Sequence, residues 1–243
     1  DRTWTFGHIV VDEAQELSPM QWRMLVRKNP LKSFTIVGDV AQVSSAAGAT
    51  DWASMLSPLF RDAWRLEELT VNYRTPALVS EVAESMAATA GVPLTRTTAV
   101  RTGQWPVEVI EASSAGIADA VVDAVALVRE SGSGTVAVIA TDNAVAALHS
   151  VLAAAIPGDV ARGAMGLRRS VAVLTPGEAK GLEFDAVVVV EPSAIVESGP
   201  RGAGSLYVAM TRPTQRLVLV ASRALPDGIR SGIEESARLL RLP

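Results

Sequence analysis

Runs of valine, isoleucine and alanine alternate with helix-forming stretches along this chain. The run Ala186 to Val190 has no polar residue, so both faces of the corresponding strand must be covered. Such strands are typical of parallel sheets with helical crossovers, and the alternation predicts the α/β fold class. The expected strands are residues 6–11, 33–37, 64–69, 107–110, 135–140, 171–174, 186–190 and 217–220. The expected helices are residues 19–28, 76–90, 116–130, 144–155, 205–211 and 229–240.

Two stretches rich in turn-forming residues, 91–106 and 157–169, are expected to be long connections. With 243 residues and 49% hydrophobic content, the chain can bury one large or two modest cores. We place the domain boundary near residues 61–64, which gives the predicted domains 1–62 and 63–243. Since the sequence begins almost inside a strand and has no start methionine, we expect it to be a fragment.

Several functional classes are excluded by composition. The absence of cysteine excludes disulfides, thiolate metal sites and cysteine nucleophiles, and the two histidines, His8 and His149, are isolated rather than clustered as metal ligands are. No signal peptide or apolar stretch of membrane-spanning length is visible, so we expect a soluble, cytoplasmic protein without a membrane partner. The net charge of −4 argues against a passive nucleic-acid-binding domain, so any such contact must be local.

Two carboxylates follow the first predicted strand. Asp12 and Glu13 come directly after Ile9-Val10-Val11 and are followed by Ala14-Gln15. An acid at the end of a buried strand can hold a Mg²⁺ shell, and the next acid can orient a water towards a γ-phosphate. The alternative is a solvated acidic pair near a helix start, because Ser18 is a good N-cap and Pro19 suits the first helical position.

A second polar turn follows the strand predicted at residues 33–37. Gly38 allows the chain to leave the sheet sharply, and Asp39 can support a Mg²⁺ shell. The uncharged Gln42 can donate an amide hydrogen to a phosphate and so sense its loss. An ordinary strand-ending Gly-Asp turn is the alternative interpretation.

Two arginines and one loop complete the candidate site. Arg74 and Arg212 carry guanidinium groups that bind phosphate oxygens bidentately, although each could also form an ordinary surface salt bridge. Between them, the polar loop 175–185 enters a buried strand, and we expect it at the carboxyl edge of the sheet, where α/β proteins bind ligands. Glu183 could accept from a ribose hydroxyl, and Thr175 or Lys180 could meet a nucleic-acid phosphate.

Together these segments resemble motifs two to six of superfamily 1 helicases of the UvrD/Rep type, which consist of two RecA-like domains. The resemblance covers residues 6–222 and rests on Asp12-Glu13-Ala14-Gln15, Gly38-Asp39-x-x-Gln42, Asn72-Tyr73-Arg74-Thr75, Lys180-Gly181-Leu182-Glu183-Phe184-Asp185 and Tyr207-Val208-Ala209-Met210-Thr211-Arg212. It implies ATP, Mg²⁺ and DNA as ligands.

The same resemblance implies a role for each matching residue. Asp12 would be the Mg²⁺ ligand, Glu13 the water-activating base, Gln42 the γ-phosphate sensor, and Arg74 and Arg212 the arginine fingers. The nucleotide would also meet Asp39, Tyr73, Gly181 and Glu183, and nucleic acid would meet Thr175 and Lys180.

Three features of the sequence differ from the UvrD/Rep pattern and narrow the resemblance to a subfamily. The sequence contains no glycine-rich phosphate loop. The segment 43–52 lacks the aromatic cluster with which unwinding relatives stack bases, and only about thirty residues separate Asn143 from Thr175, where a duplex-contacting insertion would otherwise occur. In these three features the chain is similar to the helicase-IV-like HelD proteins of Gram-positive bacteria, which act on RNA polymerase. Residues 45–49 and Val190-Glu191-Pro192 resemble the actinobacterial branch in particular.

The resemblance therefore implies the C-terminal part of a HelD-type ATP-dependent protein that binds RNA polymerase core, and by itself the fragment should not hydrolyse ATP. One alternative is a true 3′-to-5′ DNA translocase in repair, which would need aromatic stacking platforms. The chain is only 5% aromatic; Trp22 is expected in the core, and Trp52 and Trp105 are the loop candidates for stacking. A non-catalytic binding module is the third interpretation.

Overall fold

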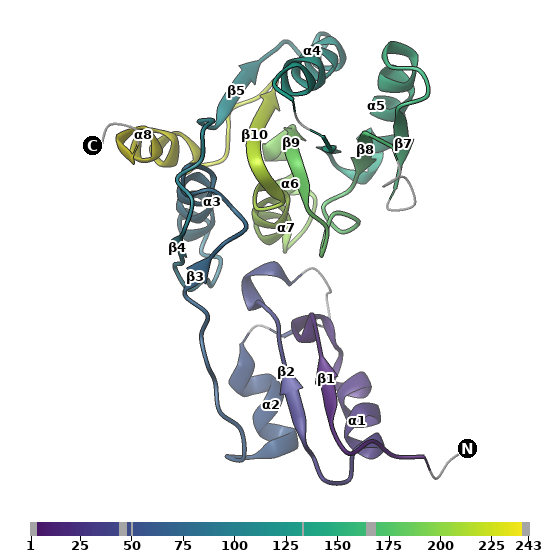
Figure 1. Cartoon of the computed structure of the whole chain (residues 1–243), viewed down its shortest axis with the longest axis vertical. Helices are drawn as coiled ribbons and strands as arrows, with labels where there is room; N and C mark the ends of the chain where they lie inside the picture. Colours follow the sequence, from purple (N-terminus) through teal and green to yellow (C-terminus); the bar gives the residue numbers. More distant parts are fainter. Residues whose placement is uncertain (1–3, 44–47, 50, 133, 164–168, 240–243) are drawn as a thin grey trace. The chain divides into compact units, whose positions relative to one another are not determined.

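The computed structural model describes residues 4–43, 48–49, 51–132, 134–163 and 169–239 (Figure 1). The chain divides into two compact units, residues 1–68 and residues 69–243, which we call the first and second units. The sequence-based boundary at residues 62 and 63 lies a few residues before this division. Most of residues 45–49, on which the HelD resemblance partly rests, and part of the predicted connection 157–169 lie outside the described residues.

In the first unit, a two-stranded parallel sheet is packed against two helices. Strand β1 (Ile9–Val11) pairs with β2 (Phe34–Ile36). Helix α1 (Pro19–Lys28) begins as predicted, because Ser18 and Gln21 form a reciprocal capping box and proline occupies the first turn. Helix α2 (Trp52–Phe60) follows, with Asp51 accepting the Ser54 N–H at its N-cap. The core contains Val11, Ala14, Trp22, Leu56 and Phe60.

The second unit contains a six-stranded parallel sheet in the order β5-β10-β9-β6-β8-β7, which confirms the predicted α/β fold class. Every neighbouring pair in it is parallel. Its strands are β5 (Glu108–Glu111), β6 (Val136–Ile139), β7 (Val160–Arg162), β8 (Val171–Leu174), β9 (Phe184–Val190) and β10 (Pro213–Ala221). Apart from this sheet, β3 (Val71–Asn72) and β4 (Thr98–Ala99) form a parallel pair.

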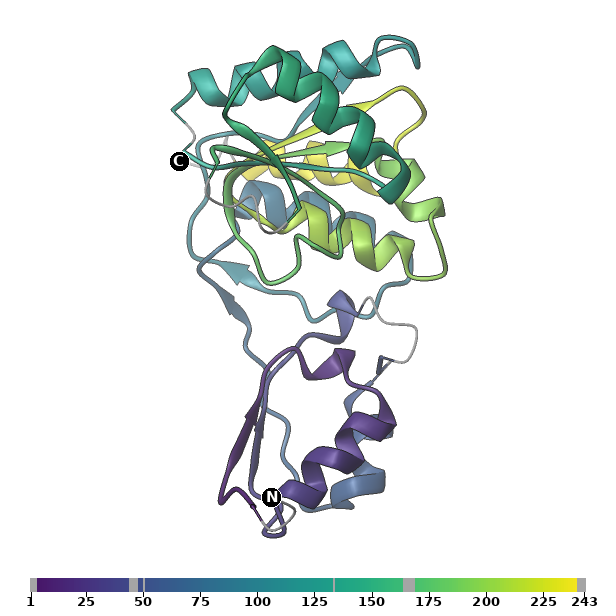
Figure 2. The same cartoon turned by 90° about the vertical axis from the view of Figure 1, so that its right-hand side faces the viewer.

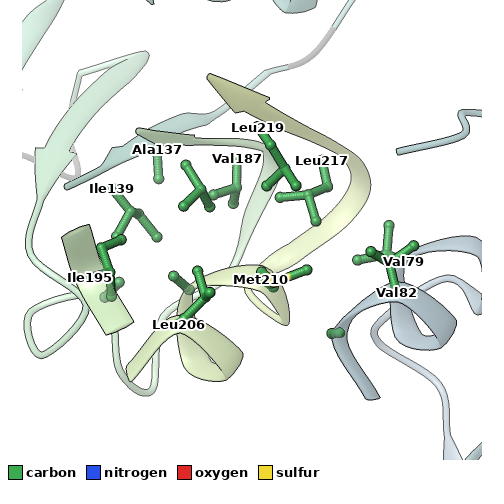
Figure 3. Close-up of a cluster of buried hydrophobic side chains, with 14 of the residues drawn as sticks. Val79, Val82, Ala137, Ile139, Val187, Ile195, Leu206, Met210, Leu217 and Leu219 are labelled. Carbon is green, nitrogen blue, oxygen red and sulfur yellow. The ribbon is translucent and has the colours of Figure 1, made fainter. Parts of the chain in front are cut away.

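Helices cover both faces of the large sheet (Figure 2). Helices α4 (Ile117–Glu130) and α5 (Asp142–Ala155) pack on one face. On the other face lie α3 (Ala77–Thr89), α6 (Pro192–Glu197) and α7 (Gly202–Met210), while α8 (Ile229–Leu239) packs against α3. Successive β6 residues alternate between the two cores, so Ala137 and Ile139 join the α7 side shown in Figure 3. Burial on both faces explains the uninterrupted apolar runs.

The structure corrects several predicted elements. Residues 64–69 form no strand, because they pair with no neighbouring strand and are largely exposed; Leu69, for example, is 85% exposed. The strand predicted from residue 6 begins only at Ile9. Strand β7 lies in a segment that we expected to be a loop, where pairing with β8 stabilises it. Helix α2 was not predicted, since an interior proline, Pro58, disfavours helix in the sequence pattern.

Candidate functional site

At the end of β1 the backbone turns through an unusual conformation. Glu13 has φ 50° and ψ 38°, in the left-handed region that non-glycine residues rarely adopt. Its backbone N–H donates to Asp12 Oδ1 at 2.8 Å, and a short 3-10 helix, Ala14–Glu16, follows. Asp12 itself is exposed and Glu13 is half-buried. Backbone strain of this kind is found at functional sites, where surrounding contacts hold it in place.

Gln15 joins this turn to the turn after β2. Its side chain is buried, with Nε2 donating to Glu13 Oε2 at 2.7 Å and Oε1 accepting the Asp39 N–H at 3.1 Å. The neighbouring backbone makes a parallel link, because the Ala14 N–H donates to the Val37 carbonyl at 3.0 Å. The Glu13 carboxylate is therefore held against the second predicted motif. We did not assign a role to Gln15 from sequence, although it belongs to the motif.

Asp39 and Gln42 interact with each other. Asp39 caps the 3-10 helix Val40–Gln42, where its Oδ1 accepts the Ala41 N–H at 2.9 Å. Its second oxygen, Oδ2, accepts from the Gln42 side-chain amide at 3.0 Å. The predicted Mg²⁺-supporting and phosphate-sensing residues are thus brought together on one turn. Among the described residues, no group of three or more histidine, aspartate or glutamate side chains forms a metal site by itself.

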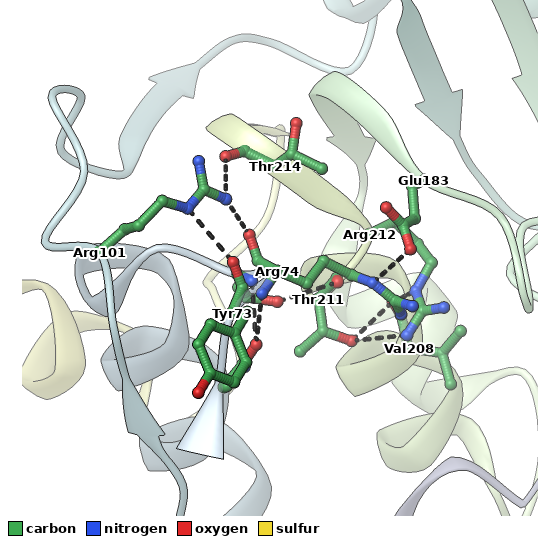
Figure 4. A network of polar contacts seen from close by, with 10 residues as sticks. Tyr73, Arg74, Arg101, Glu183, Val208, Thr211, Arg212 and Thr214 are labelled. Atoms are coloured by element: carbon green, nitrogen blue, oxygen red, sulfur yellow. Dashed lines mark hydrogen bonds and ion pairs between the residues drawn. The ribbon is translucent and has the colours of Figure 1, made fainter.

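In the second unit, Arg74 and Glu183 form an ion pair, with Arg74 Nε 2.6 Å from Glu183 Oε1 (Figure 4). The two side chains are 44% and 47% exposed, so solvent can reach both. The turn carrying Arg74 is fixed by Asn72, whose Oδ1 accepts the backbone N–H groups of Arg74 and Thr75 at 3.0 and 3.1 Å. Two residues from different predicted motifs are therefore adjacent. Tyr73, beside them, is exposed.

Arg212 is buried, with 2% exposure, at the C-terminal end of α7. Its Nε donates to the Val208 carbonyl at 3.0 Å and its Nη2 to Thr211 Oγ1 at 3.2 Å. Thr75 donates to the Thr211 carbonyl at 3.3 Å, which connects the segment around Arg74 to the end of α7. A cation at this position also stabilises the C-terminal end of the helix, so Arg212 has a structural role here. Its contact with a phosphate stays a prediction.

The loop 175–183 runs from one edge of the sheet to the other. Thr175 follows β8, at the carboxyl edge, whereas Glu183 precedes β9, at the amino edge, and β8, β6 and β9 are all parallel. The prediction that the whole loop lies at the carboxyl edge is therefore wrong for Glu183. Gly181 adopts φ 73°, a conformation that favours glycine. Lys180, before it, is half-buried.

Thr175 and Glu178 form reciprocal hydrogen bonds. The Thr175 N–H donates to Glu178 Oε2 at 2.9 Å, and the Glu178 N–H donates to Thr175 Oγ1 at 3.2 Å. The Glu178 carboxylate thus occupies a backbone donor that an anionic ligand of Thr175 could otherwise use. We did not identify this carboxylate from the sequence.

The carboxylate of Asp185, the last residue of the loop motif, accepts hydrogen bonds from two neighbouring strand starts. Its Oδ2 accepts from the Thr135 N–H and hydroxyl at 2.8 and 3.0 Å, and its Oδ1 accepts from the Gln215 amide at 2.9 Å. These contacts join the starts of β6, β9 and β10 at the amino edge. The role of Asp185 is to align the strands beside Glu183.

The tryptophans considered for base stacking are constrained. Trp22 is buried as predicted, and Trp52 begins α2 and packs against the core of the first unit. The Arg216 guanidinium carbon lies 4.6 Å from the centre of the Trp105 ring, and Arg216 is held by Glu108 at 2.6 Å. One face of Trp105 is therefore occupied by a buried cation.

A parallel sheet covered by helices on both faces, with polar motifs in this order, defines a RecA-like α/β protein of the helicase class. The model of the viral superfamily 1 RNA helicase core domain matches residues 2–221, and the chain belongs to this family. This places the chain within superfamily 1, as the motifs indicated. A search among curated proteins found no match.

Solved structures show similar folds. The C-terminal domain of a possible DNA helicase from Lactobacillus plantarum WCFS1 is 25% identical, with a TM-score of 0.50 over 65% of this chain and 92% of that domain. Arterivirus nonstructural protein 10, a helicase, is 17% identical, with a TM-score of 0.50 over 93% of this chain and 42% of that protein. The chain thus spans less than half of the viral helicase. No helix in the described part of the chain is long and apolar enough to cross a membrane.

Proposed function

We propose that this chain supplies motifs two to six of an ATP-dependent superfamily 1 helicase-like protein. The observation that carries the proposal is the side chain of Gln15, which joins Glu13 to Asp39 through hydrogen bonds of 2.7 and 3.1 Å. A carboxylate that orients the attacking water must be held in a fixed position relative to the phosphate. The link through Gln15 would hold the Glu13 carboxylate in this way. A phosphate loop, which this sequence lacks, would have to complete the nucleotide site.

Glu13 is the proposed base. Its carboxylate would accept a proton from the attacking water, while the Gln15 amide keeps one of its oxygens in place. Asp12 would hold Mg²⁺, with support from Asp39. Mg²⁺ prefers oxygen ligands and binds through one or two carboxylates together with phosphates, so this donor set fits. When bound, Mg²⁺-ATP would supply the transferable phosphoryl group and its charge neutralisation.

The second unit would supply cations and a contact to the sugar. Arg74 and Arg212 would stabilise charge on the phosphoryl group in transit. Gln42, which belongs to the first unit, would report the presence of the γ-phosphate. Glu183 would accept from a ribose hydroxyl next to Arg74. Tyr73 and Gly181 lie on the same two segments as Arg74 and Glu183, and we assign them to the nucleotide.

The nucleotide proposal is tested in the full-length protein. Glu13→Gln keeps the shape of the side chain and removes the base, so Mg²⁺-ATP should bind with an affinity near that of the wild type but should not turn over. Phosphate release measures the turnover, and a fluorescent ATP analogue measures the binding. Glu130→Gln, at an exposed site on α4, is the matched control. Unchanged turnover in Glu13→Gln would refute the assignment of the base.

For the partner, we propose a HelD-type protein that acts on RNA polymerase core in the cytoplasm. The net charge of −4, the constrained tryptophans and the short path from Asn143 to Thr175 all support a weak grip on duplex DNA. Affinity capture with RNA polymerase core should retain the full-length protein, and it should displace strands of a tailed duplex poorly. Robust strand displacement without polymerase retention would overturn this proposal.

A DNA translocase acting 3′ to 5′ in repair is the second candidate. The 25% identity to a domain of a possible DNA helicase favours it. In this case Thr175 and Lys180 would contact the DNA strand. The full-length protein would then displace strands of a tailed duplex efficiently and would not be retained by RNA polymerase core. A non-catalytic binding module is the third candidate, and any ATP turnover that depends on Glu13 would exclude it.

A further inference from the structure

Arg101 lies just after β4, where the backbone of Val100 and Arg101 is hydrogen-bonded to both sides of the turn that carries Arg74. The Val100 N–H donates to the Asn72 carbonyl at 2.9 Å, and the Ala77 N–H, at the start of α3, donates to the Arg101 carbonyl at 2.8 Å. Hydrogen bonds therefore hold the backbone from which the Arg101 side chain extends.

The Arg101 guanidinium contacts three backbone carbonyls (Figure 4). Its Nε donates to Tyr73 O at 3.2 Å, and its Nη2 donates to Arg74 O and, at 3.0 Å, to Thr214 O. Thr214 belongs to the start of β10, at the amino edge of the large sheet. One side chain thus joins the end of β3 to the sheet edge that also carries Glu183.

Arg74 needs this support because its own side chain is not packed in a core. Its guanidinium meets Glu183 at 2.6 Å while remaining 44% exposed, so the position of its backbone decides where the guanidinium can reach. Asn72 Oδ1 accepts the Arg74 N–H at 3.0 Å, and Arg101 donates to the Arg74 carbonyl. Both polar groups of the Arg74 backbone are therefore fixed by side chains.

We propose that Arg101 is a positioning residue for Arg74: it would hold the Tyr73-Arg74 backbone so that the Arg74 guanidinium meets the nucleotide phosphates beside Glu183. This inference rests on the proposed ATP site and adds a residue outside the helicase motifs. Arg101 donates from two nitrogens of one planar group, Nε and Nη2, whereas lysine would have to donate to all three carbonyls from a single nitrogen.

The test is a double-mutant cycle in the full-length protein, with kcat and KM for ATP measured in the wild type, Arg101→Ala, Arg74→Ala and the double variant. Displacing a reacting group by about 1 Å can lower the rate on the order of 10²-fold, so Arg101→Ala should lower kcat/KM by about 10- to 100-fold. If Arg101 acts through Arg74, the same change should have no further effect in the Arg74→Ala background. Arg101→Lys should recover only part of the loss.

Arg230→Ala, on α8, removes an exposed ion pair with Glu111 of β5, and this matched control should retain wild-type kinetics. Losses that multiply in the double variant would overturn the inference and assign Arg101 a general role in folding, which a lowered thermal midpoint would also reveal. Wild-type protein without ATP turnover would refute the proposed function itself. An active Arg74→Ala variant would refute the role of Arg74 and, with it, that of Arg101.

Discussion

Gln15 Oε1 occupies the space that a side chain on residue 38 would need: an ideal β-carbon built on Gly38 would lie 2.1 Å from it. Gly38 is required here for close approach, since the buried Gln15 side chain must reach the Asp39 N–H. The glycine after β2 therefore serves the link between the two acidic turns.

Gly38→Ala should destabilise the first unit, because either Gln15 or the backbone must move. We expect a loss on the order of 1–3 kcal/mol in the free energy of unfolding, as for other overpacked sites. Chemical denaturation measures it. Gly7→Ala is the control, because a β-carbon at Gly7 meets nothing within 4 Å, and its effect should stay within about 0.5 kcal/mol. Equal stability of the two variants would contradict this account.

Glu178→Gln should strengthen binding of single-stranded DNA if Thr175 contacts a phosphate. Glutamine can keep the hydrogen bond with the Thr175 N–H but removes the competing charge. One charge near 4 Å in water is worth about 1 kcal/mol, or about fivefold in affinity. Fluorescence anisotropy of the full-length protein at low salt measures it, with Glu130→Gln as the charge-matched control. The same affinity in both variants would remove Thr175 from the nucleic-acid site.

Glu84 on α3 should make the second unit less stable at neutral pH than at mildly acidic pH. Burial raises the pKa of this carboxyl, against the opposing effect of hydrogen bonds from the Thr97 N–H and hydroxyl. Since the folded state then holds the proton more tightly than the unfolded chain, the stability contribution is complete below the usual pKa and is lost as pH rises through the folded pKa.

Glu84→Gln should accordingly raise the thermal midpoint at pH 7, and its advantage over the wild type should shrink as pH falls towards the usual carboxyl pKa. Circular dichroism at several pH values measures both. Glu234→Gln, on the exposed side of α8, should show no such trend. An advantage that is constant with pH would mean that the Glu84 charge is not the cause.

Arg212→Ala should lower the rate of ATP hydrolysis in the full-length protein by on the order of 10³-fold, because it removes charge stabilisation in the transition state. Some loss of stability should accompany it, since the guanidinium also donates to the Val208 carbonyl. Phosphate release measured below the thermal midpoint of the variant separates these effects. An unchanged rate in a folded variant would show that Arg212 has only the structural role.

The 243-residue chain by itself should show negligible ATP hydrolysis, because its sequence contains no phosphate loop to cradle the β- and γ-phosphates. Steady-state phosphate release with Mg²⁺-ATP measures this. Turnover by this chain that disappears in Glu13→Gln would contradict the prediction.

Local sequence patterns determined the fold class and most of the elements. The apolar run 186–190 within β9 predicts a strand buried on both faces, and Ser18 and Pro19 predict the start of α1. The order of the motifs likewise follows from the sequence, as does the α/β architecture. Each of these inferences depends on neighbours in the chain.

Only the tertiary structure decided which polar residues meet. Gln15 with Asp39, Arg74 with Glu183, and Arg101 with Thr214 are pairs far apart in sequence, and no local pattern marks them. The same holds for β7, which exists because β8 offers a partner, and for residues 64–69, which have none. Hydrogen bonds and strand ladders need a partner at about 3 Å, and folding, rather than sequence distance, determines which groups come that close.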